Sequence, residues 1–186
     1  SERRLAGLDR AAKPATAETI AQPLRAVSTN ILAGLIETLA ASPYEGRADL
    51  PHLAGALQLE ADELFPIVEA LQLLGFAEIA DGDVRLTDDG RAFVGFDTDA
   101  RKAQFRAALL TRGPLAAHIR RGLAERDVLG RPSHRAPAAR FREELEDHLR
   151  PGDAARTLRA TVAWGRYAEL FAYDELAGEF SLEDPE

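Results

Sequence analysis

The chain has 186 residues, of which 46% are hydrophobic, and a formal net charge of -8. A chain of this length buries roughly two-thirds of its unfolded surface, enough for one ordinary core or two small ones. It contains no Cys, which excludes disulfides, thiol nucleophiles and thiolate metal sites. No run approaches the roughly 20 apolar residues of a membrane span, and no signal-peptide core is present, so we expect a cytoplasmic protein without membrane insertion. Met is absent even at position 1, so we expect a processed or trimmed chain.

The first predicted elements are a tether and two helices. Residues 1–23 have no apolar period and are rich in Ala, Pro and Thr, which predicts a linker or tether. From Leu24 apolar residues recur every three or four positions, which predicts a helix that ends near Ser42–Pro43. A second, short helix is expected to begin around Asp49, with Pro51 tolerated in its first turn.

A third helix and a β-hairpin complete the first predicted module, residues 24–97. The third helix is apolar on one face, and Gly75 supplies its C-terminal stop. Two alternating segments, Phe76–Ala80 and Val84–Thr87, then flank Asp81–Gly82, a dipeptide that readily takes the positive φ values of a type I′ turn.

Residues 98–186 form the second predicted module, which is less regular. We expect Phe93–Thr111 to be largely helical, and Pro114 to open another helix through Leu123. An irregular loop punctuated by Gly and Pro follows as far as Pro137. Apolar residues at every fourth position then predict a helix from Phe141 to about Arg150.

The end of the chain repeats the pattern of the first module. Pro151–Asp153 is predicted to form a turn and the N-cap of a last helix. A hairpin from Leu170 to Leu182, turning through Asp174–Gly178, should follow that helix. Three helices and a hairpin are the winged-helix plan, so the predicted fold is mostly α with small β-hairpins, arranged as tandem winged-helix-like modules. By fold analogy, such modules present surfaces for recognition or regulation and rarely enclose a catalytic pocket.

Many short segments, in one order from about residue 30 to residue 183, resemble a known family. They are Gly34–Leu39, Asp49–Leu50 with Leu53–Ala54, Leu59–Glu60 with Asp62–Ala70, Leu74–Ala77, Leu86–Thr87 with Gly90 and Phe93, Pro114–Arg121 and Trp164–Tyr173. Together they resemble the AAA-associated C-terminal domain, found after the nucleotide-binding domain in ATP-binding subunits of ABC importers of the nitrate, sulfonate and bicarbonate type. The resemblance implies a regulatory or assembly role beside an ATPase, in cis or in trans, at the inner face of the plasma membrane. It implies no catalytic residues, and the loop 126–135 looks longer than is usual for the family.

Enzyme chemistry has no recognisable motif in this sequence. There is no G-x-x-x-x-G-K-[ST] loop, so we expect a non-enzymatic chain that neither binds nor hydrolyses ATP. The four histidines lack metal-ligand spacing, and we expect no metal or cofactor. The acids of Glu143–Asp147 alternate with apolar residues on one helix, which favours a solvated face over paired catalytic carboxylates.

Charge is distributed unevenly along the second half of the chain. Residues 101–142 carry 11 Arg or Lys against two acids, whereas residues 168–186 carry seven acids and no base. These charges either neutralise each other across the fold, with counter-charges from the helix around Glu143–Asp147 or from the tail after Glu169, or provide a docking surface for an anionic partner. The candidate interaction surface comprises His118, Arg120, Arg121, Arg156, Arg159 and Arg166.

Two alternatives to protein contact remain open. A winged-helix DNA-binding regulator would place its third helix in the major groove, but residues 61–74 carry three acids and no base, so nucleic acid is not the expected partner. Residues 153–167 have a net charge of +2 and oppose this alternative less strongly. A small-molecule-sensing module would use a cleft between the modules, lined by Trp164, Tyr167 and Tyr173, although such aromatics are more often core residues. A homodimer is also left open.

Overall fold

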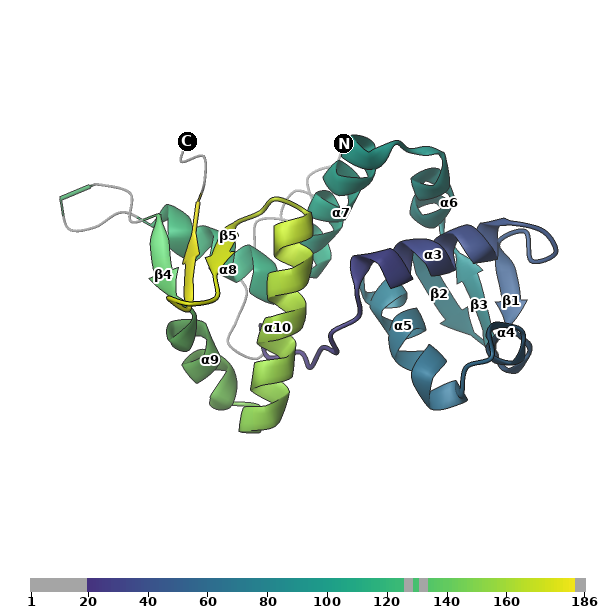
Figure 1. The fold of residues 1–186 in the computed structure, drawn as a ribbon, viewed down its shortest axis with the longest axis horizontal. Coiled ribbons are helices and arrows are strands. Elements are labelled where there is room, and N and C mark those ends of the chain that lie inside the picture. Colours follow the sequence, from purple (N-terminus) through teal and green to yellow (C-terminus); the bar gives the residue numbers. More distant parts are fainter. Residues whose placement is uncertain (1–19, 126–128, 131–133, 183–186) are drawn as a thin grey trace, which may run out of the picture.

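The computed structural model describes residues 20–125, 129–130 and 134–182. Within these residues eight helices and two small three-stranded sheets confirm a mostly α fold with small β-hairpins (Figure 1). In chain order the elements are α3 (Thr29–Ala40), β1 (Arg47–Asp49), α4 (Leu50–Leu57), α5 (Ala61–Leu73), β2 (Ala77–Ala80), β3 (Asp83–Leu86), α6 (Asp88–Gly95), α7 (Thr98–Arg112), α8 (Pro114–Ala124), β4 (Arg135–Pro137), α9 (Ala138–Glu146), α10 (Pro151–Tyr167), β5 (Ala172–Asp174) and β6 (Glu179–Ser181).

One order of elements occurs twice. Helix, strand, helix, helix, strand, strand describes α3 to β3, here called the first unit, and also α8 to β6, the second unit. In each antiparallel sheet the last strand is central, with the orders β1-β3-β2 and β4-β6-β5. The helices α6 and α7 connect the units, and α7 lies between them in Figure 1.

Each sheet contains one strand that the sequence pattern did not predict. β1 pairs with β3 so that Ala48 lies opposite Val84, and β4 pairs with β6 so that Ala136 lies opposite Phe180. Both strands are three residues long, which is too short for an alternating pattern to be visible. The prediction of an irregular loop as far as Pro137 was therefore wrong at β4, and residues 126–128 and 131–133 of that loop lie outside the described residues.

The first predicted hairpin is confirmed. Asp81 and Gly82 have φ values of 55° and 80°, as a type I′ turn requires. Ala77, Val84 and Leu86 are buried, so the alternation of the two strands directs one face of the sheet into the core.

The second predicted hairpin is also confirmed. Its turn is closed by Asp174, whose Oδ1 accepts hydrogen bonds from the backbone N–H groups of Leu176 and Ala177. Phe180 on the central strand is fully buried against the rings of Phe141 and Phe171, with centroid distances of 5.6 Å and 4.9 Å. Aromatic packing therefore anchors this small sheet.

Two predicted helix boundaries in the first half were wrong. The first helix begins at Thr29 and not at Leu24, because the Ser28 side chain caps it by accepting from the N–H of Ile31. The predicted helix Phe93–Thr111 is two helices, since α6 ends at Gly95 and the Asp97 side chain caps α7. The short helix α4 is capped by Asp49 as expected.

Two boundaries in the second half also differ. α9 ends at Glu146, which leaves Leu149 beyond the helix that was predicted to reach about Arg150. α10 begins at Pro151 with Arg150 as N-cap residue, so Asp153 lies in the first turn of the helix. The prediction that Pro151–Asp153 forms a loop turn and the N-cap was therefore wrong. Pro fits there because the first helical N–H groups have no intrahelical partner.

The third helices of the two units, α5 and α10, end in the same way. After each helix one residue adopts positive φ, Gly75 at 83° and Glu169 at 58°. The next N–H then bonds back five residues, from Phe76 to the Leu71 carbonyl and from Leu170 to the Gly165 carbonyl, both at 2.9 Å. This geometry satisfies helix carbonyls that would otherwise lack donors.

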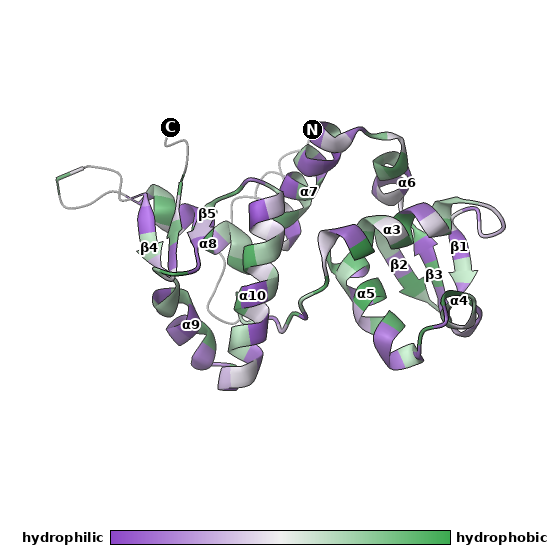
Figure 2. Cartoon of the chain, in the orientation of Figure 1, coloured by the Kyte–Doolittle hydropathy of each residue, from purple (hydrophilic) through white to green (hydrophobic). Residues whose placement is uncertain are grey.

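The cores of the two units are continuous across α7. The ring of Phe105 on α7 lies 6.1 Å from Phe76 of the first unit, and 6.4 Å and 5.2 Å from Trp164 and Tyr167 of the second. Hydrophobic and hydrophilic residues alternate along α10 (Figure 2), as expected of a helix with one face in this core. We call this set of rings the aromatic junction.

A pair of glycine substitutions isolates the effect of backbone strain, because an added Cβ would clash with nothing at either site. A Cβ added at Gly82 or at Gly34, which lies inside α3, would meet nothing within 4 Å, and only Gly82 has positive φ. Gly82→Ala should lower the free energy of unfolding by about 1 kcal/mol, whereas Gly34→Ala should raise it by about 0.5–1 kcal/mol through better helix propensity. Urea unfolding of both variants measures these free energies. If Gly82→Ala leaves the free energy of unfolding unchanged, the turn does not control the stability of the hairpin.

Candidate interaction sites

The segment before α3 packs on the second unit, although it leads into the first. The Leu24 N–H donates to Thr157 Oγ1 at 3.1 Å, and the indole Nε1 of Trp164 donates to the Val27 carbonyl at 2.8 Å. Ile20 and Ala21 are buried. Residues 20–28, here called the strap, therefore tie the start of α3 to α10. A free tether was the wrong expectation for residues 20–23, and residues 1–19 lie outside the described part of the chain.

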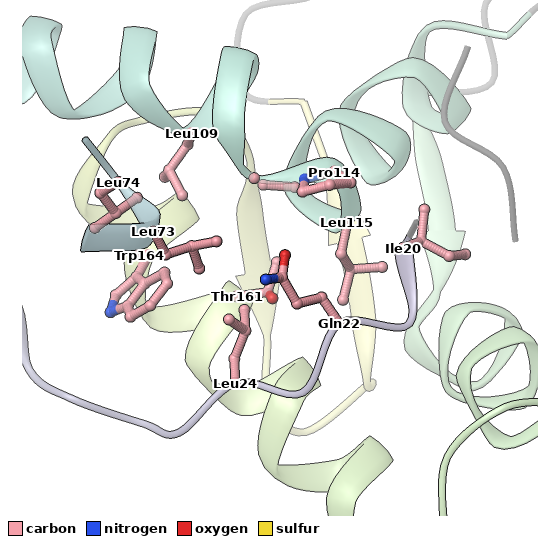
Figure 3. Close-up of a pocket in the computed structure, with 12 residues that line it drawn as sticks. Ile20, Gln22, Leu24, Leu73, Leu74, Leu109, Pro114, Leu115, Thr161 and Trp164 are labelled. Carbon is pink, nitrogen blue, oxygen red and sulfur yellow. The ribbon is translucent and has the colours of Figure 1, made fainter. Parts of the chain in front are cut away.

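A small apolar cavity lies where the strap meets both units. Side chains from the strap, α5, α7, α8 and α10 surround it, among them Trp164 and Leu115 (Figure 3). Its volume is about 20 Å³, room for a single water molecule. This cavity cannot admit a solute, and Trp164 serves as a core residue of the aromatic junction.

The three aromatics predicted to line one cleft lie in different places. Trp164 is fully buried beside the strap, and Tyr167 packs edge-on against Phe105. Tyr173 belongs to the second sheet, with its ring 4.9 Å from Phe180. The predicted cleft of Trp164, Tyr167 and Tyr173 is therefore not formed.

A broad open groove runs between the two third helices. Pro66 and Glu69 of α5 line one wall, Arg156 and Arg159 of α10 line the other, and the strap also contributes. A winged helix that binds DNA inserts its third helix into the major groove. Here both third helices instead turn these residues toward one shared groove, and Glu69 places negative charge in it.

Most of the candidate interaction residues have partners inside the fold. His118 Nε2 lies 2.7 Å from Glu144 Oε2, an internal counter-charge from the acidic helix as expected. Arg156 pairs with Asp153 one turn away on α10. Arg166 pairs with Glu175 in the second hairpin at 3.3 Å.

Arg120 has a structural role that its position in the sequence did not reveal. Its Nη1 donates to the Leu170 carbonyl at 2.7 Å, just after the end of α10. Burial, and secondly the neighbouring charge of Arg106, lower the pKa of Arg120 from its usual value. Arg106 Nη1 in turn donates to the preceding carbonyl, that of Glu169, also at 2.7 Å. Two guanidinium groups thus hold the chain that leaves α10.

An open cleft surrounds these two arginines. Four cations line it, Lys102, Arg106, Arg120 and Arg166, together with the acids Asp99 and Glu169. We call it the basic cleft. Lys102 and Arg106 were missed as site residues, although they lie four positions apart within the basic stretch and therefore share a face of α7.

The remaining two candidates, Arg121 on α8 and Arg159 on α10, are exposed. Neither has an ion-pair partner among the residues that the structure describes. Of the six candidates, these two are the cations free to meet a partner. They lie on different helices of the second unit.

The residues that the structure describes contain neither a cluster of metal ligands nor a helix that could span a membrane. No group of three or more His, Cys, Asp or Glu residues there could hold a metal ion. Every helix in that part of the chain is too short or too polar to cross a bilayer.

The family model of the C-terminal AAA-associated domain matches residues 51–174, more than half of the chain. The chain belongs to this family. Comparisons with curated proteins and with solved structures found no significant match. The matched part of the AAA-associated domain runs from α4 to β5. The elements α3 and β1 of the first unit and the central strand β6 of the second unit lie outside the matched part. Membership supports an accessory role beside an ATPase.

Adjacent arginines of the AAA-associated domain provide a matched test of the capping role. Arg120→Gln removes the charged donor from the Leu170 carbonyl and should lower the free energy of unfolding by about 1–2 kcal/mol. Arg121→Gln changes an exposed side chain and should change the free energy of unfolding by no more than about 0.5 kcal/mol. Equal effects of the two substitutions on the denaturant midpoint would contradict the capping role of Arg120.

Proposed function

We propose that this AAA-associated domain is a non-enzymatic accessory domain of the ATPase subunit of an ABC importer of the nitrate, sulfonate and bicarbonate type. It regulates or helps assemble that ATPase through protein–protein contact, in cis or in trans, at the cytoplasmic side of the membrane. The observation that carries this proposal is the family match over residues 51–174. ATP hydrolysis belongs to the partner in this account.

The architecture supports a recognition role. We propose that both units are winged-helix-like modules, since each has the same helix and strand order and a three-stranded sheet with its last strand in the centre. The exposed cations Arg121 and Arg159 are available to an acidic surface of the partner. Charges of this kind act mainly on the rate of encounter and on partner choice.

The two alternatives have less support. The groove that the third helices share is lined by Arg25, Arg156 and Arg159 but also by the acids Glu69 and Asp153, and Arg156 is paired with Asp153, so only a small excess of positive charge is left for phosphates. Sensing of a small molecule by Trp164, Tyr167 and Tyr173 together is opposed by their separate positions, since Tyr167 packs on Phe105 and Tyr173 on Phe180.

A charge-reversal variant tests the contact. Arg121→Glu with Arg159→Glu should leave the fold intact, because both side chains are exposed, and should weaken association with the ATPase several-fold. The loss should come chiefly from slower association, with a reduced salt dependence. Interferometry against the purified ATPase at two ionic strengths measures both effects. We leave Arg120 unchanged, because it caps the chain after α10.

The control changes the net charge equally at other sites. Arg142 on α9 and Arg150, which precedes α10, are exposed, and Arg142→Glu with Arg150→Glu should bind the ATPase like the unmodified chain. If the Arg121→Glu with Arg159→Glu variant is folded and binds normally, these two cations do not contribute to docking.

A further inference from the structure

Three helices build the basic cleft. Lys102 and Arg106 come from α7, Arg120 from α8 and Arg166 from the last turn of α10. Asp99 and Glu169 are the acids in its lining, which leaves cations in excess. The cleft shares no lining residue with the water-sized cavity or with the groove between the third helices.

Backbone carbonyls fix the two central guanidinium groups. Arg106 and Arg120 donate to the consecutive carbonyls of Glu169 and Leu170, each through Nη1 at 2.7 Å. Because consecutive carbonyls are close together, the two groups converge from different helices. A guanidinium has five N–H donors in a fixed plane, so each arginine keeps donors beyond the one that its carbonyl uses.

These two arginines differ from the other cations of the cleft in lacking a negative partner. Lys102 Nζ lies 3.4 Å from Glu169 Oε1, and Arg166 pairs with Glu175. Neither Arg106 nor Arg120 is paired with a carboxylate in the described part of the chain. Among the described residues both arginines bind only carbonyl dipoles, which offset less of their charge than an anion would.

Electrostatic repulsion and partial burial make this arrangement costly without an anion. Both side chains are half-buried, and burial together with the charge of Arg106 lowers the pKa of Arg120. An oxyanion that accepts N–H groups from both arginines would offset both effects, because charge-assisted hydrogen bonds are strongest to ionised acceptors. Arginine forks match the geometry of phosphate and carboxylate oxygens.

We propose that the basic cleft binds a small oxyanion, which accepts hydrogen bonds from the free N–H groups of Arg106 and Arg120, with Lys102 and Arg166 at the rim. Such a ligand would connect α7, α8 and α10 and would stabilise the folded chain by mass action. The inference is independent of the ATPase partner, and its test uses the isolated chain.

Titration with inorganic phosphate, and separately with acetate, tests the proposal. At low and constant chloride, NMR chemical shifts of backbone amides around Leu170 should follow a saturable curve with a dissociation constant in the roughly millimolar range for at least one of the two anions. The probe that binds more tightly distinguishes a tetrahedral from a planar oxyanion, and either result supports the site.

Two variants and two controls make the result specific. Lys102→Gln with Arg166→Gln leaves both carbonyl hydrogen bonds in place and should weaken binding several-fold. Arg106→Lys keeps the charge but loses the fork, and it should also weaken binding. The controls Arg142→Gln with Arg150→Gln and Arg121→Lys should bind like the unmodified chain.

The outcomes that would overturn the proposal are specific. One is the absence of saturable shifts with either anion in the folded, unmodified chain. The other is equal weakening in the cleft variants and in the controls, which would indicate screening of the whole protein and not a site. Circular dichroism of each variant confirms that it is folded before titration.

Discussion

Contact of the Phe105 ring with aromatic rings from both repeated units makes one core out of two small ones. Phe76 lies on one side of it, and Trp164 and Tyr167 lie on the other. Each unit alone is short, and small domains bury too little apolar surface to be more than marginally stable. The strap strengthens this junction, because the Val27 carbonyl gives the buried Trp164 indole its hydrogen-bond partner.

The helix α7 connects the aromatic junction to the protein surface. Its apolar face provides Phe105, while Lys102, Arg106 and Arg112 extend toward the ends of the third helices. Arg112 lies against Gly75 after α5, and Arg106 holds the Glu169 carbonyl after α10. A partner or ligand that moves α7 would therefore act on both units at once.

Sequence patterns predicted the elements that depend on neighbouring residues. They did not predict the elements and contacts that form only through residues far away in the chain. The Asp81–Gly82 turn followed from the φ preferences of two residues. The strands β1 and β4 could not be predicted, because each is defined only by pairing with a strand more than 30 residues later. Leu24 matched a helical period but lies in the strap, where Thr157 binds its N–H. The cations of the site were visible in the sequence, but the carbonyl that Arg120 binds lies 50 residues away.

The most direct test of the account is whether the two units unfold together. NMR signals of Val84 in β3 and Phe180 in β6 report on the two sheets, and the single Trp, Trp164, reports on the junction by fluorescence. A shared core predicts that all three probes give the same urea midpoint and the same dependence on denaturant. Two separate midpoints, one for each sheet, would contradict the claim that the aromatic junction unites them.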